Sequence, residues 1–208
     1  MTQRQLLVLA TRNAGKTREI RELLKDFAVE IKNLDDFGSI PPVEENGTTF
    51  DDNAYKKAAF TAKVLGLPTL ADDSGLEVDA LGGAPGVHSA RYAGPNATDK
   101  KNNAKLSREM KGKTNRVATF VCVISVAVPS GVALTYEGRC EGLVAEVPAG
   151  ENGFGYDPLF YYPPLNRTFA QLSAEEKNQV SHRGKALAQL KKEFDEVLTW
   201  IRQRLLDS

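Results

Sequence analysis

The chain has 208 residues, which is enough for one domain or for two closely joined lobes. Hydrophobic residues make up 41% and charged residues 26%, ordinary values for a soluble globular protein. Lys and Arg together number 27, and so do Asp and Glu. The net charge of zero argues against broad, sequence-independent binding to nucleic acid, which needs a basic face, but it leaves room for a small basic pocket.

Neither a membrane span nor a signal peptide is predicted. No stretch approaches the ~18 consecutive apolar residues of a membrane helix, and residues 1–9 lack the long apolar core of a signal peptide. Cys122 and Cys140 lie in apolar or strand-like surroundings without the spacing of metal ligands. These features predict a cytoplasmic protein whose two cysteines are reduced core thiols rather than a disulfide.

The chain opens with a strand, a loop, a helix and a second strand. The apolar run Leu6–Ala10 indicates a buried strand, and the polar stretch Thr11–Gly15 indicates a loop. Apolar residues at helical spacing predict a helix over Lys16–Phe27, and weak alternation over Val29–Leu34 predicts another strand. This order is the usual start of an α/β protein.

A second helix is predicted from Thr49, where Asp52 stands at capping-box spacing. Gly66 and Pro68 predict its end. Thr69–Ala71 then reads as a short strand that runs directly into acidic residues. These residues therefore continue the alternation of helices and strands.

The middle of the chain turns from helical to β-rich. Thr98 caps a third predicted helix, which reaches about Met110. Val117–Val128 and Val132–Arg139 predict a hairpin across a Pro-Ser-Gly turn. Another strand is expected over Gly142–Val147, and one long helix over Ser181–Leu206. The predicted fold class is α/β with a mixed sheet, parallel in its early strands and antiparallel in its later ones.

The loop between the first strand and the first helix has the chemistry of an anion site. Backbone N–H groups at a helix N-terminus attract anions, and Lys16 adds a positive charge. The triplet Gly15-Lys16-Thr17 resembles the end of a P-loop, but Ala10 stands where the first glycine of that pattern belongs. An ordinary turn with a surface lysine remains equally open from this segment alone.

Acidic residues gather at two places. Glu44 and Glu45 lie in a predicted loop, and Asp72 and Asp73 follow the short strand. A carboxylate pair at a strand end suits magnesium, which takes oxygen ligands and keeps several waters. The alternative is a solvated acidic turn, but adjacent aspartates repel each other, which favours a cation nearby.

Two segments near the C-terminus could recognise a base. In Gly153–Pro158, aromatic residues between glycines can lie flat against a ring, and Asp157 can accept a hydrogen bond from a ring N–H. A structured turn with core aromatics is the alternative. Further on, Ser181 caps the predicted last helix, which places Arg183 in the first turn, where the helix dipole disfavours a cation. This position hints at a ligand.

Taken in order, these segments resemble the inosine/xanthosine triphosphate pyrophosphatase family. The resemblance covers about residues 6–200, and although each motif is weak alone, the ordered set is specific. The matching motifs are Thr11-x-Asn13-x-Gly15-Lys16, Glu44, Phe50-x-x-Asn53-Ala54 with Lys56 and Lys57, Ala71–Leu76, Gly82–Gly86, Ser89–Tyr92, Phe154–Pro158 and Ser181–Gly184. Many members have glycine at the position of Arg12.

The resemblance implies a role for each matching residue. Asp73 would accept the proton of the attacking water, Lys56 would help to neutralise the phosphates, and Ser74 would touch the substrate. Glu44 and Asp73 would hold Mg²⁺, with Asp72 in support. The phosphate and sugar would be held by Thr11, Arg12, Asn13, Ala14, Gly15 and Lys16, and the base by Phe154, Gly155, Tyr156, Asp157, Lys177, His182 and Arg183.

The resemblance also implies a single domain over residues 1–208, elongated, with helices flanking the mixed sheet and an active-site cleft between two lobes. It implies a cytoplasmic homodimer that hydrolyses non-standard purine nucleoside triphosphates (ITP, dITP, XTP) to the monophosphate and pyrophosphate. Two alternatives stay open: a P-loop-like kinase or ATPase acting at the γ-phosphate, and a regulatory module that binds nucleotide without turnover. Neither nucleic acid nor a membrane is an expected partner.

Overall fold

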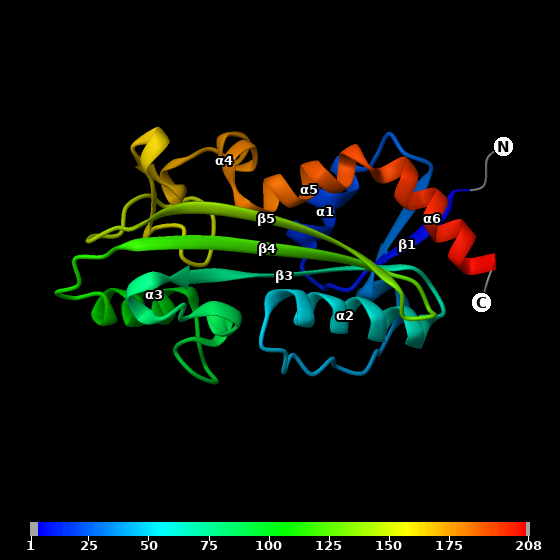
Figure 1. Cartoon of the computed structure of the whole chain (residues 1–208), viewed down its shortest axis with the longest axis horizontal. Coiled ribbons are helices and arrows are strands. Elements are labelled where there is room, and N and C mark those ends of the chain that lie inside the picture. Colours follow the sequence, from blue (N-terminus) through cyan, green and yellow to red (C-terminus); the bar gives the residue numbers. More distant parts are fainter. Residues whose placement is uncertain (1–3, 207–208) are drawn as a thin grey trace. The chain divides into compact units, whose positions relative to one another are not determined.

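A computed structural model describes residues 4–206, except for the side chain of Ala14. Its strands form one seven-stranded sheet in the order β2-β1-β3-β4-β5-β6-β7 (Figure 1). The strands are β1 (Gln5–Leu9), β2 (Val29–Asn33), β3 (Thr69–Val78), β4 (Val117–Ala127), β5 (Ala133–Val144), β6 (Phe160–Tyr162) and β7 (Arg167–Thr168). β1 pairs in parallel with β2 and β3, whereas β6 pairs antiparallel with β5 and β7. The predicted mixed α/β sheet is confirmed.

The helices begin where the sequence offers capping side chains. Asn13, Thr49 and Thr98 each accept a hydrogen bond from a backbone N–H of the first turn that they precede. Gly66 ends the second helix in the left-handed conformation that favours glycine. The α-helices are α1 (Ala14–Leu23), α2 (Phe50–Leu65), α3 (Asp99–Glu109), α4 (Ala174–Val180), α5 (His182–Lys192) and α6 (Phe194–Leu206).

The chain divides into two compact units. One comprises Met1–Asp73, Val123–Tyr136 and Ala186–Ser208, and the other comprises Ser74–Cys122 and Glu137–Lys185. The strands β3, β4 and β5 each contribute residues to both units. The elongated shape and the cleft expected between two lobes remain predictions.

Each unit has its own core. In the first unit, small residues let α2 lie close to the sheet, since Ala58 and Ala62 pack with Ala71 of β3 and Ala127 of β4. There α2 covers one face of the strands, and α1 and α6 lie on the other (Figure 1). In the second unit, α3 packs on the strands through a cluster of large side chains that includes Leu76, Leu106, Phe120, Phe160 and Phe169.

Several predicted boundaries differ from the structure. α1 spans Ala14–Leu23 rather than Lys16–Phe27. β3 does not stop at Ala71 but continues through the acidic residues to Val78. Gly142 lies inside β5 rather than at the start of a new strand. The Phe160 ring approaches it so closely that a Cβ would come within 2.6 Å, which explains a glycine within the strand. The predicted final helix is two helices, α5 and α6, which meet at Glu193.

Two further expectations can be compared with the described residues. Cys122 and Cys140 are both buried and are not joined in a disulfide, as predicted for core thiols. Within residues 4–206, no helix combines the length and the apolar character that a membrane crossing requires.

Candidate functional site

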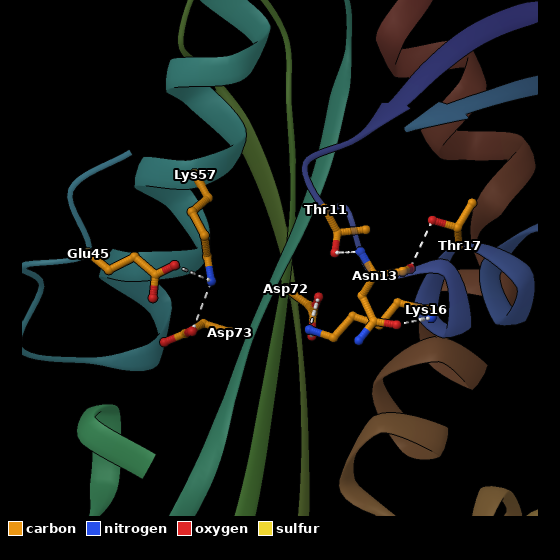
Figure 2. A network of polar contacts seen from close by, with 8 residues as sticks. All are labelled: Thr11, Asn13, Lys16, Thr17, Glu45, Lys57, Asp72 and Asp73. Atoms are coloured by element: carbon orange, nitrogen blue, oxygen red, sulfur yellow. Dashed lines mark hydrogen bonds and ion pairs between the residues drawn. The ribbon is translucent and has the colours of Figure 1, made fainter. Parts of the chain in front are cut away.

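The loop before α1 is built around its capping residue. The Asn13 side chain accepts from the Lys16 backbone N–H at 3.0 Å, and the Thr11 hydroxyl accepts from the Asn13 N–H at 3.1 Å. The Lys16 ammonium points to Asp72 and donates to both carboxylate oxygens at 2.7 and 2.8 Å (Figure 2). Arg12 instead binds the exposed Asp35 at 2.7 Å. The loop therefore directs one cation, Lys16, toward the acidic strand.

The neighbouring carboxylates of β3 do not form a pair. Successive side chains of a strand point to opposite faces of the sheet, and β3 runs straight through both aspartates. Asp72 accordingly meets Lys16, whereas Asp73 accepts from Lys57 of α2 at 2.9 Å (Figure 2). The interpretation of Asp72 and Asp73 as a carboxylate pair at a strand end is wrong, because each faces its own lysine.

Lys57 brings two carboxylates together on the α2 side of the sheet. Its ammonium lies 2.9 Å from Asp73 and 3.6 Å from Glu45, and its side chain is 14% exposed. The adjacent residues predicted for these roles lie elsewhere: Lys56 donates to Asn46 at 2.8 Å, and Glu44 is exposed. As the carboxylate that joins Asp73 in this cluster, the structure thus favours Glu45 over Glu44. As the cation beside Asp73, it favours Lys57 over Lys56.

The Glu45 loop is held against α2 by a buried amide. The Asn53 side chain is fully buried, and its oxygen accepts from the Gly47 N–H at 2.8 Å. A Cβ on Gly47 would lie 2.6 Å from that oxygen, so only glycine permits this approach. Lys57 lies one turn beyond Asn53 on the same helix. The same face of α2 therefore positions both the lysine and the acidic loop.

Asp73 has the electrostatics of a proton acceptor. Burial raises the pKa of its carboxyl above the ordinary value, and the charge and hydrogen bond of Lys57 offset part of that rise. A carboxylate with a raised pKa takes up a proton more readily than a solvated one, which suits general-base work.

The donors around Lys57 are compatible with magnesium. Within residues 4–206, no three or more His, Cys, Asp or Glu side chains are arranged as a ready metal site. Magnesium is commonly bound through one or two carboxylates together with waters and substrate phosphates. Glu45 and Asp73, which approach the same ammonium, offer that smaller set of oxygen ligands.

The second unit holds the glycine-rich aromatic segment in a fixed turn. The Asp157 carboxylate is buried, accepts from the Phe154 N–H at 2.8 Å and forms an ion pair with Lys177. A Cβ on Gly153 would come within 2.0 Å of the same carboxylate. Asp157 was predicted to accept from a base, but its Oδ2 already accepts from the Phe154 N–H of the turn and from Lys177.

Phe154 is the aromatic residue of this turn that faces outward. It is 61% exposed, whereas Tyr156 is buried and donates its hydroxyl proton to the Ser89 carbonyl at 2.8 Å. The Lys177 ammonium lies 4.6 Å from the centre of the Phe154 ring, and the Arg183 guanidinium carbon lies 5.8 Å from it. An exposed ring beside two cations can stack on a base while the cations donate to its carbonyl edge.

Ser74 and His182, two further predicted site residues, are less exposed than Phe154. Ser74 follows Asp73 in β3 and is half-buried. His182 begins α5, is buried, and stacks on Phe120 with ring centroids 4.6 Å apart. The stacking fixes the imidazole within the second unit, where Arg183 follows it at the start of α5.

Comparisons with known proteins agree over nearly the whole chain. The model of the Ham1 family matches residues 7–193. The chain is 61% identical over 202 residues to the dITP/XTP pyrophosphatase of Syntrophobacter fumaroxidans, covering 97% of this chain and 87% of that protein. It is 50% identical to the protein of the same name from Geobacillus kaustophilus, covering 92% and 95%. The structure of a HAM1 protein from Coxiella burnetii matches with a TM-score of 0.89 at 45% identity, covering 92% and 99%. The chain therefore belongs to the Ham1 family.

Proposed function

We propose that this protein hydrolyses non-standard purine nucleoside triphosphates, with dITP and XTP among them, to the monophosphate and pyrophosphate. The observation that carries the proposal is the cluster of Glu45, Lys57 and Asp73, in which one ammonium lies between two carboxylates. Relatives that are 61% and 59% identical bear the name dITP/XTP pyrophosphatase. A γ-phosphoryl transferase has no such support, and Ala10 interrupts the P-loop pattern.

The chemistry divides between a base and cations. The oxygen of a water attacks the α-phosphorus, its proton passes to the Asp73 carboxylate, and the bond from that phosphorus to the bridging oxygen breaks. Pyrophosphate leaves with the bonding electrons. Lys57, which lies beside Asp73, offsets the negative charge that builds up on the phosphates.

Glu45 and Asp73 are the residues that would hold Mg²⁺. When bound, the ion would supply further positive charge to the phosphate oxygens and help to acidify the water. Asp72, which is bound to Lys16, would act by orienting that lysine.

We assign base recognition to Phe154, Lys177 and Arg183. Phe154 offers its exposed face for stacking, and the two cations donate toward the 6-keto oxygen, where adenine carries a donor instead.

The family resemblance further supports a cytoplasmic homodimer, and a monomer mass by light scattering at micromolar concentration would refute the dimer.

Replacing Arg183 by alanine tests this assignment. We expect kcat/KM for ITP to fall much more than kcat/KM for ATP, because the lost donor matches the 6-keto edge of the first base alone. The measurement is kcat/KM for both nucleotides on wild type and Arg183→Ala, with Lys185→Ala as the control for loss of a cation from the same helix. If both substrates lose the same factor, Arg183 binds phosphate instead.

A further inference from the structure

Helix α3 holds the peptide groups that follow Phe154. The Gly155 N–H donates to the Asp99 carboxylate at 2.7 Å, and the Gly155 carbonyl accepts from the Asn103 amide at 2.7 Å. Asp99 and Asn103 are four residues apart in α3, so both side chains project from one face of the helix. Both polar groups of this glycine are therefore bound by neighbouring turns of one helix.

Asp99 and Asn103, which together form a clamp on Gly155, are themselves held in place. The Asn103 amide nitrogen also donates to the Asp99 backbone carbonyl at 2.7 Å, which uses its second proton. Thr98 caps α3 just before Asp99 and accepts from the Lys101 N–H. The two clamping side chains thus belong to a well-formed helix start, a rigid support for a loop.

No side chain packs at the place where a Gly155 side chain would stand, so the hydrogen bonds to α3 contribute to the position of this glycine. Gly155 has φ of +60°, and a Cβ placed on it would meet nothing within 4 Å. A hollow of about 490 Å³ lies beside it, lined by Asn103 of α3 and by Asn152, Phe154 and Gly155 of the loop. The position of Gly155 therefore depends on its bonds to α3 and on the buried Tyr156 that follows it in the chain.

The bonds of this loop also restrict the backbone of Phe154, whose ring is exposed. The Phe154 N–H is bound by Asp157, and the next residue is bound by α3, so the backbone is fixed on both sides of a side chain that is 61% exposed. An exposed ring with a fixed backbone loses little conformational entropy when a base stacks on it.

We propose that Asp99 and Asn103 are positioning residues for base recognition, acting through Gly155 to hold the Phe154 ring ready for stacking. The inference rests on the proposed function and extends it to α3, outside the motifs of the family resemblance. Because the base is remote from the reacting phosphorus, loss of positioning weakens substrate binding and leaves the chemical step unchanged.

A double-mutant cycle tests the clamp. Asn103→Ala is expected to raise KM for dITP about 3- to 10-fold with kcat within about twofold, a part of what a full base–aromatic stack is worth. In a Phe154→Ala background the same substitution is expected to change KM less than about 1.5-fold, since the ring through which it acts is gone. Asp99→Ala should behave alike, and Lys100→Ala, exposed on the same turn, should change neither parameter.

The outcomes separate the clamp from simple stability and from the proposed function. An equal rise of KM in both backgrounds, or a fall in kcat with KM unchanged, would overturn the clamp. The cycle is repeated on the Kd of deoxyinosine monophosphate by calorimetry, which needs no turnover and is expected to show the same coupling. Absence of dITP hydrolysis by wild type would contradict the proposed function alone.

Discussion

Replacing Asp73 by asparagine is expected to lower kcat by about 10²–10⁴-fold, the usual contribution of a general base. The amide keeps the shape of the side chain but cannot take up the proton of the attacking water, and it is a poorer magnesium ligand. The fold should persist. Burial raises the pKa of Asp73, so ionising this carboxyl costs more free energy in the folded chain than in the unfolded chain, and removing the charge should not lower Tm.

The matched control is Asp51→Asn, on the exposed surface at the start of α2. It removes the same charge from the same unit without touching the cluster, so kcat should stay near that of wild type. Steady-state kinetics at saturating magnesium and a thermal melt are needed for both variants. Near-wild-type kcat in Asp73→Asn would remove this carboxylate from the mechanism.

Replacing Lys57 by methionine is expected to lower kcat/KM by about 10²–10³-fold, the cost of removing one preorganised cation or donor from a transition state. Methionine keeps much of the apolar stem of the lysine, so the variant mainly loses the charge that lies between Glu45 and Asp73. The two carboxylates would then repel each other without compensation.

Lys56→Met is the control, and the pair decides between adjacent lysines. Lys56 donates to Asn46 and makes no described contact with Asp73, so its loss should change kcat/KM less than about threefold. The kinetic constants of both variants for dITP would be compared. A larger loss in Lys56→Met than in Lys57→Met would restore the assignment of Lys56 that the family resemblance implied.

Local patterns predicted the elements that carry the site. The start of α2 at Thr49 and the stop at Gly66 follow from short-range chemistry that a sequence displays. The hairpin of β4 and β5 followed from two β-rich runs around a tight turn. These elements depend little on distant contacts, which is why the mixed sheet could be predicted.

Side-chain direction limited the prediction of the site. Asp72 and Asp73 point to different lysines because β3 continues through both of them. From the sequence alone the lysine partners are unknown, so two adjacent acidic residues were interpreted as the end of the strand. Similarly, Lys56 and Lys57 differ by one helical step, about 100° around the axis, and only the position of β3 decides which of them meets Asp73.

The contribution of α3 could not be read from the sequence. Asp99 and Asn103 are 56 and 52 residues before Gly155, and their pattern is that of any helix start after a capping threonine. Their role is visible only in three dimensions, where the N–H and the carbonyl of one glycine meet the same helix.

Hydrolysis of dITP in H₂¹⁸O with magnesium tests the central claim most directly. Mass spectrometry of the products should show deoxyinosine monophosphate carrying one ¹⁸O on its phosphate and pyrophosphate without label, since water attacks the α-phosphorus. Asp73→Asn, assayed beside wild type, excludes a contaminating phosphatase if it forms neither product at the wild-type rate. Release of inorganic phosphate with deoxyinosine diphosphate, or label in the pyrophosphate, would contradict the account.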